Sequence, residues 1–329
     1  MDTVEDKPRK KTPREMAFAL LPTLLTLGNA VCGFGAITIL ARVGPSLDML
    51  PGDLASQIDP ASQMVKAALL IFLAMLFDAL DGSAARLTNQ SSEFGAMLDS
   101  LCDVVSFGVA PAFMMLKLTD PQYHLMETPY QPPFYYSIDF LWTIATLYMA
   151  CAILRLARFN VETDDDDSHE GFSGLPSPAA AGVIAGFPIG VMTLKKLLTQ
   201  STATGVVAEV TGTAPSADPA VQVSRGTPWA EPLAEILLPT LAVLLPFITL
   251  ATAVLMVSRI RYPHVFNQIL RGNRGRLQLL QLVFTLALVF QVKGMAIPVI
   301  FCWFAFAGPV NAIWRRYIVR RLPFRGAAL

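Results

Sequence analysis

Residues 78–103 read DALDGSAARLTNQSSEFGAMLDSLCD and lie where two strongly apolar stretches meet. The pattern within them is D-x2-D-G-x2-A-R-x8-G-x3-D-x3-D, formed by Asp78, Asp81, Gly82, Ala85, Arg86, Gly95, Asp99 and Asp103. On helices, Asp78 and Asp81 share one face at i and i+3, and Asp99 and Asp103 share one at i and i+4. If the polar residues 87–93 form a tight turn, the two helices are antiparallel and the two pairs of carboxylates meet.

Four carboxylates at the ends of membrane-length helices are costly unless something pairs them. Hard oxygen ligands in this number favour a divalent cation such as Mg²⁺ or Mn²⁺. The sequence therefore predicts a metal site formed by Asp78, Asp81, Asp99 and Asp103. For any single aspartate, a helix cap or a structural ion pair is an alternative, but four at these spacings favour the metal.

The composition indicates an integral membrane protein. Of the 329 residues, 53% are hydrophobic and only 15% are charged, against roughly 25% charged in a soluble domain. A membrane-spanning helix needs about 20 mostly apolar residues. The predicted spans are 22–42, 64–85, 94–117, 137–157, 176–194, 235–257, 277–293 and 295–313. The expected fold is an all-α polytopic membrane helix bundle of about eight transmembrane helices.

The basic residues predict the orientation of this bundle. With eight spans, the Lys and Arg divide eighteen to seven between the two sides, which accounts for all 25 of them. Because cytoplasmic loops carry the excess of Lys and Arg, we expect both termini and the aspartates to be cytoplasmic in a cell (inner) membrane protein. A seven-helix alternative joins 277–313 into one bent helix and places the basic C-terminus outside.

The aspartate pattern resembles the signature of the CDP-alcohol phosphatidyltransferases, membrane enzymes that join a CDP-linked lipid or sugar to an alcohol. All eight positions and every spacing match. Further segments resemble the bacterial phosphatidylserine synthases of this family, and they are 21–34, 106–111 (SFGVAP), 155–160 (RLARFN) and 174–179 (GLPSPA). The resemblance covers positions 20 to 190 in patches, and the last third of the chain carries no matching motif.

The resemblance implies transfer of the phosphatidyl group of CDP-diacylglycerol to the hydroxyl of L-serine, giving phosphatidylserine and CMP. It implies that Asp78, Asp81 and Asp99 are metal ligands, and that Asp103 is the general base and also touches a metal. Competing interpretations are the same chemistry on glycerol 3-phosphate or inositol phosphate and, more distantly, an aspartate-rich membrane prenyltransferase or a transporter. The expected partners are the two substrates and membrane lipids, with a homodimer implied by the family and no nucleic acid.

The resemblance also implies two sets of substrate contacts. The residues expected to bind CDP are Thr26, Asn29, Gly82, Ala85, Arg86 and Gly95. The residues expected to bind the acceptor are Ser106, Arg155, Arg158 and Asn160. Each has a structural alternative: helix packing for the small residues and Ser106, bonds to a neighbouring helix for Thr26 and Asn29, and headgroup anchoring for the arginines.

We expect five regions along the chain. They are a basic cytoplasmic N-terminal segment (1–15), a catalytic membrane core (16–197), a flexible exported loop (198–234), C-terminal membrane helices (235–313) and a basic cytoplasmic tail (314–329). The basic N-terminal segment is expected to lie along anionic lipid headgroups.

Overall fold

The computed structural model describes residues 13–43, 59–88, 93–120, 136–162, 172–211, 230–262 and 293–314. The helices are α1 (Pro13–Arg42), α3 (Pro60–Thr88), α4 (Glu93–Asp103), the π-helix η2 (Val104–Val109), α5 (Ala110–Thr119), α6 (Ile138–Glu162), α7 (Ser177–Thr211), α8 (Ala230–Val257), the short 3₁₀ helix η4 (Lys293–Met295) and α11 (Ala296–Trp314). A minimal antiparallel ribbon pairs β1 (Phe172–Ser173) with β2 (Arg261–Tyr262). The predicted all-α class is confirmed.

Six of the described helical segments are long and apolar enough to cross a membrane. They are Leu21–Arg42, Pro60–Ala84, Glu93–Thr119, Ile138–Val161, Ser177–Lys196 and Ile236–Val257. These segments agree closely with the first six predicted spans, because an apolar run of this length is a strong signal. The chain is an integral membrane protein.

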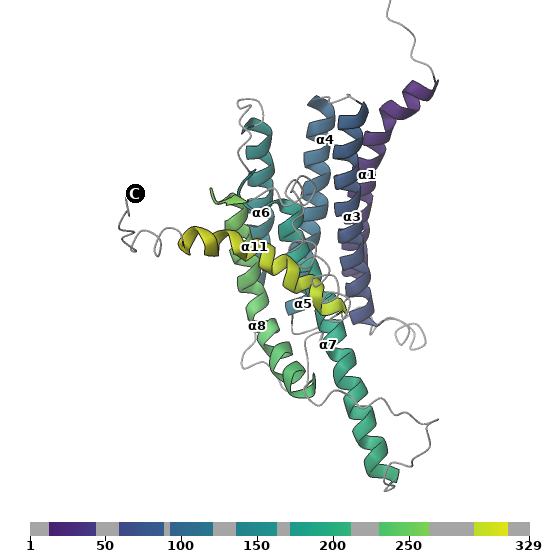
Figure 1. Cartoon of the computed structure of the whole chain (residues 1–329), viewed down its shortest axis with the longest axis vertical. Helices are drawn as coiled ribbons and strands as arrows, with labels where there is room; N and C mark the ends of the chain where they lie inside the picture. The colour runs from purple at the N-terminus through teal and green to yellow at the C-terminus, as the bar shows by residue number, and fades with distance from the viewer. Residues whose placement is uncertain are drawn as a thin grey trace, which may run out of the picture.

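The predicted count of eight spans is only partly matched by the described residues. The seventh predicted span, 277–293, lies outside them. The eighth corresponds to α11, whose apolar part Ala296–Val310 is shorter than the other six and crosses the bundle obliquely (Figure 1). Helix α7 also continues to Thr211, which is further than the predicted start of the loop at residue 198.

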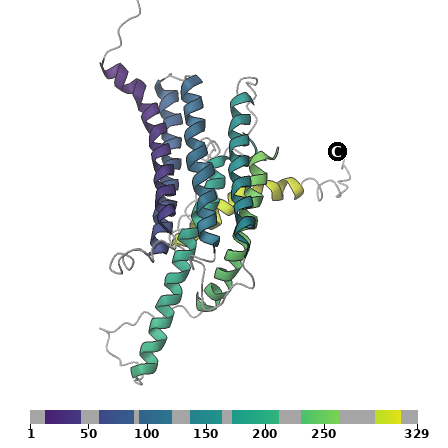
Figure 2. The same cartoon turned by 180° about the vertical axis from the view of Figure 1, so that it is seen from behind.

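The spans form two groups joined by α7. Helices α1 and α3 pack along each other, with α4 and η2 also on α1, and α6 packs on α8. Helix α7 contacts both α3 and α8 and therefore lies between the groups, as both views of the ribbon show (Figures 1 and 2). Within the spans, 72% of α7 and 67% of α4–α5 is buried, against 28% of α3 and 33% of α1. The central helices thus carry the core, and the outer helices keep large apolar faces for lipid.

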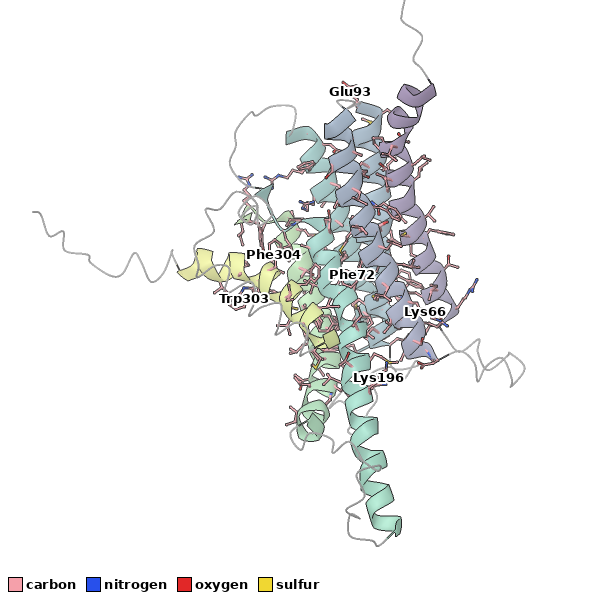
Figure 3. The ribbon with its side chains drawn as sticks, turned by 45° about the vertical axis from the view of Figure 1, so that its right-hand side comes forward. Lys66, Phe72, Glu93, Lys196, Trp303 and Phe304 are labelled. Atoms are coloured by element: carbon pink, nitrogen blue, oxygen red, sulfur yellow. The ribbon has the colours of Figure 1, made fainter. Side chains whose placement is uncertain are left out.

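Local hydrogen bonds stabilise the beginning of α3 and the residue that follows α1. Asp59 precedes α3, and its carboxylate accepts hydrogen bonds from the backbone N–H groups of Ala61 and Ser62 at 3.2 and 3.0 Å, which is an N-terminal cap. At the same side of the bundle, Lys117 Nζ donates to the carbonyl of Val43, just after α1, at 2.9 Å. Figure 3 shows Lys66 and Lys196 at this end and Glu93, which begins α4, at the opposite end.

Candidate active site

Carboxylates from α3 and α4 meet inside the bundle near the Glu93 end. One oxygen from each of Asp78, Asp99 and Asp103 lies within 4.8 Å of the other two. Helix α3 ends at Thr88 and α4 begins at Glu93 at the same end of the bundle, so the helices are antiparallel as predicted (Figure 1). Three of the four carboxylates predicted from the sequence therefore come together.

Asp81 completes the cluster from one side. Its carboxyl lies within hydrogen-bonding range of the Asp99 carboxyl. Its Oδ2 also lies 2.9 Å from the hydroxyl of Thr26, a buried residue of α1. Asp81 is thus held at the edge of the three-oxygen group, with α1 behind it.

Asn29 supports the opposite corner of the cluster. Its side chain is fully buried, and Nδ2 donates to Oδ1 of Asp103 at 2.8 Å. Thr26 and Asn29 are three residues apart on α1 and so share one face of it. This face therefore touches one aspartate of α3 and one of α4, and it connects the two halves of the cluster.

The chain just after Asp103 is a π-helix that lies directly against α1. Ser106, fully buried in η2, donates from Oγ to the backbone carbonyl of Asn29 at 2.9 Å. A Cβ added to Gly33 would lie 2.7 Å from the Cα of Ser106, so this approach needs glycine. A single π-helical turn inside a longer helix is often found at a functional site, and here it directly follows Asp103.

The residues fit a divalent cation. All four side chains offer hard oxygens, which suit Mg²⁺-like and Mn²⁺-like ions. Oδ1 of Asp99 is buried and has no hydrogen-bond partner among the described residues. A buried carboxylate oxygen without a partner is costly unless a ligand binds it. The three converging carboxylates and this oxygen fit a divalent-cation site, while Asp81, the fourth predicted ligand, is not in the group of three.

Arg155 of α6 is a cation near the cluster, on a helix of the other group. Its guanidinium is within electrostatic range of Asp78 and Asp103, and Nη1 donates to Oγ of Ser177 at 2.9 Å. One turn further along α6, Asn160 Oδ1 accepts a hydrogen bond from Ser100 of α4 at 3.1 Å. Arg158 is half-buried on the same helix. The structure thus places Arg155 beside the carboxylates and Asn160 against α4.

The structure describes the surroundings of some of the predicted nucleotide-binding residues of α3 and α4 but not of others. Gly82 is exposed, and a Cβ added to it would meet nothing within 4 Å among the described atoms. Among the described atoms, therefore, nothing packs closely against this glycine, and its structural alternative of close helix packing has no support there. Gly95 is half-buried on α4. Ala85 and Arg86 lie in the last turns of α3, and their side chains fall outside the described part.

Sequence reasoning missed three features of this site. Ser177 and Gly33 were each only part of a segment that resembles the family, with no role assigned, and the π-helix has no recognisable sequence pattern. The pair of prolines around Ser177 is the one usable signal, because proline is favoured in the first turn of a helix and so places Ser177 at a helix start.

The chain was compared with known proteins. The model of the CDP-alcohol phosphatidyltransferase family matches residues 19–213. The chain belongs to this family. All four aspartates, Arg155 and Ser177 lie inside the matched region, while α8 and α11 lie beyond it.

Several curated proteins are similar to parts of the chain. The CDP-diacylglycerol–serine O-phosphatidyltransferase of Methanocaldococcus jannaschii is 40% identical over 36% of this chain and 48% of its own length. The archaetidylserine synthase of Methanothermobacter thermautotrophicus is 35% identical over 52% and 58%. The CDP-diacylglycerol–serine O-phosphatidyltransferase of Mycobacterium tuberculosis is 31% identical over 57% and 54%. The chain spans about half the length of the curated relatives it matches.

Proposed function

We propose that this protein transfers the phosphatidyl group of CDP-diacylglycerol to the hydroxyl of L-serine, forming phosphatidylserine and CMP. The observation that carries the proposal is the convergence of Asp78, Asp99 and Asp103 within 4.8 Å, in a chain of this family. The relatives named above support serine as the acceptor, because their names specify transfer to serine or synthesis of a serine lipid.

Asp103 is proposed as the general base. Its carboxylate takes the proton of the serine hydroxyl, and the freed oxygen attacks the β-phosphorus of CDP-diacylglycerol. The bond from that phosphorus to the bridging oxygen breaks, and CMP leaves with the electron pair. Because Asn29 holds Oδ1 of Asp103, Oδ2 is the oxygen available for the proton.

Asp78, Asp81, Asp99 and Asp103 are proposed to hold Mg²⁺ or Mn²⁺. When bound, such ions neutralise the diphosphate and stabilise the attacking and leaving oxygens of the transfer. The four carboxylates would hold these ions on the side of the cluster where Gly82 lies. Gly82, Ala85, Arg86 and Gly95 are proposed to line the CDP site there, with Arg86 reaching the phosphates through its planar guanidinium.

The acceptor is proposed to bind between α4 and α6. Arg155 is within electrostatic range of the aspartates and supplies the cation that a serine carboxylate needs. Arg158, Asn160 and Ser106 are kept as further proposed acceptor residues, with the Ser106 hydroxyl donating to the carbonyl of Asn29. The excess of basic residues supports an active site on the cytoplasmic face of the inner membrane. A homodimer, which the family resemblance implies, is part of the proposal. The five regions predicted along the chain are kept in this proposal except that the exported loop begins after α7, which continues to Thr211.

An acceptor panel tests the proposal. Purified protein with CDP-diacylglycerol is given L-serine, glycerol 3-phosphate, inositol phosphate or no acceptor, and the lipid products are separated and identified. We expect phosphatidylserine from serine together with stoichiometric CMP. A lipid product from a phosphorylated acceptor, with none from serine, would replace serine by that acceptor. No CMP with any acceptor would reject the transferase proposal.

A further inference from the structure

The guanidinium of Arg155 is engaged on one side only. Nη1 donates to Oγ of Ser177 at 2.9 Å, whereas the buried Nε has no hydrogen-bond partner among the described residues. In a guanidinium, Nε–H and one N–H of Nη2 point along the same edge, opposite to Nη1. Planar anions such as carboxylates bind such an edge with two parallel hydrogen bonds. The contact with Ser177 therefore leaves the two-donor edge for a ligand.

Ser177 is well placed to fix this orientation. It is fully buried and is the first residue of α7. Two backbone bonds connect the residues just before it to the end of α8: the N–H of Gly174 donates to Ile260 O at 2.9 Å, and that of Leu175 donates to Leu255 O at 3.0 Å. Helix α7, which Ser177 begins, and the two backbone hydrogen bonds to the end of α8 thus hold the Ser177 hydroxyl in place.

The turn that delivers Ser177 depends on Gly174. This residue has a φ of 88°, in the region that favours glycine. A Cβ at this position would also lie 3.0 Å from the carbonyl oxygen of Ser258. The start of α7 is consequently held tightly against α8, and a functional group supported by such packing keeps its position well.

We propose that Ser177 is a positioning residue that presents the Nε–Nη2 edge of Arg155 to the carboxylate of the acceptor. This inference rests on the proposed function and extends it, because it names the edge of Arg155 that binds the carboxylate and gives Ser177 a role. An acceptor carboxylate beside Asp78 and Asp103 is repelled unless a cation pairs it, and Arg155 is within electrostatic range of both.

The proposal predicts discrimination against acceptors without a carboxylate. A site built to donate hydrogen bonds to a substrate group rejects an analogue that lacks this group, because the buried donors are then left unpaired. L-serinamide keeps the hydroxyl and the amine of serine but has no carboxylate. The wild-type protein should therefore use L-serine with a much higher kcat/KM than L-serinamide.

The test compares Ser177→Ala, Ser177→Thr and Arg155→Lys in purified full-length protein, with kcat and KM measured for L-serine, L-serinamide and CDP-diacylglycerol. Ser177→Ala should raise the KM for serine about three- to tenfold, the range for losing one hydrogen bond. It should leave the KM for CDP-diacylglycerol within about twofold and reduce the preference for serine over serinamide by a similar factor. Arg155→Lys should reduce that preference about tenfold or more, because lysine lacks the two-donor edge. Ser177→Thr should keep the wild-type preference that Ser177→Ala loses, because threonine retains the hydroxyl.

Ser258→Ala is the matched control. Its hydroxyl donates to Leu255 O at 2.8 Å near the same turn, so this change removes an equivalent hydroxyl without touching Arg155. It should leave the preference unchanged. The inference is overturned if Ser177→Ala keeps the wild-type preference, if it weakens serine and serinamide equally, or if Ser177→Thr fails to keep that preference. Absence of phosphatidylserine with the wild-type protein would instead reject the proposed function itself.

Discussion

Asp103 differs from the other three aspartates in what surrounds it. A neighbouring helix holds one of its oxygens through Asn29, and the π-helix follows it directly. Asp78 and Asp99 face each other across the gap between α3 and α4, and Asp81 rests on Thr26. Proton transfer by Asp103, which also touches the metal, and metal binding by the other three are the roles that we propose.

Asp103→Asn separates chemistry from binding. Asparagine keeps the shape of the side chain but cannot take the proton of the acceptor. We expect turnover to fall by about 10²-fold or more, the usual scale for losing a general base, while CDP-diacylglycerol still binds. Asp78→Asn or Asp81→Asn should instead weaken binding of metal and nucleotide. Steady-state kinetics and equilibrium binding measure both, and near-wild-type turnover in Asp103→Asn would remove Asp103 from this role.

Asn29→Ala decides between two roles for Asn29. Family resemblance predicts a contact with CDP, whereas the structure places its amide against Asp103. If it mainly holds Asp103, kcat should fall about tenfold or more, because hydrogen bonds to charged groups are worth about 1.5–3 kcal/mol, with the KM for CDP-diacylglycerol nearly unchanged. A rise in that KM at constant kcat would favour the nucleotide contact.

At the scale of helices, α1 packs closely against η2, next to the hydrogen bond from Asn29 to Asp103. Gly33 lies where these two helices touch, and Gly82 lies beside open space. Both glycines lie in long apolar helices, α1 and α3. They therefore form a matched pair for testing whether the close contact at Gly33 contributes to stability.

Gly33→Ala should destabilise the protein by about 1–3 kcal/mol, the usual cost of overfilling a packed site, because its Cβ would press on the backbone of Ser106. Gly82→Ala should leave stability unchanged or raise it by about 0.5–1 kcal/mol, the helix preference of alanine over glycine. Thermal unfolding in detergent compares the two variants. Equal melting temperatures would show that α1 and η2 are not tightly packed at Gly33.

The sequence predicted the membrane spans better than it predicted the contacts between them. Long apolar runs determined six spans, and aspartate spacing determined which helix faces meet, because both depend on local periodicity. The π-helix after Asp103 and the hydrogen bond from Arg155 to Ser177 depend on packing between distant segments. The continuation of α7 to Thr211 was missed because its Thr- and Ala-rich residues lack an apolar stripe.

At the scale of the whole molecule, the six spans alternate in direction (Figure 1). Lys66 and Lys196 lie at one end, opposite Glu93 (Figure 3). The motif helices α3 and α4 meet at the Glu93 end. The side of the membrane on which this end lies follows from the basic residues alone, and that orientation remains a prediction.

Cysteine labelling tests the orientation. In a protein with Cys32, Cys102, Cys151 and Cys302 replaced, a single cysteine placed within 212–229 should react with an impermeant thiol reagent in intact cells. A cysteine near position 272 should react only after the membrane is permeabilised, because the basic loops are expected to be cytoplasmic. The reverse labelling pattern would place the active site outside.

The central claim is that the four aspartates act through a divalent cation, and chelation tests it most directly. CMP release from CDP-diacylglycerol with L-serine is measured in purified protein, in excess EDTA, and after Mg²⁺ or Mn²⁺ is added back. The account predicts that EDTA abolishes CMP release and that one of the two ions restores it, whereas Asp99→Asn shows little recovery. Undiminished CMP release in excess EDTA would contradict the metal site.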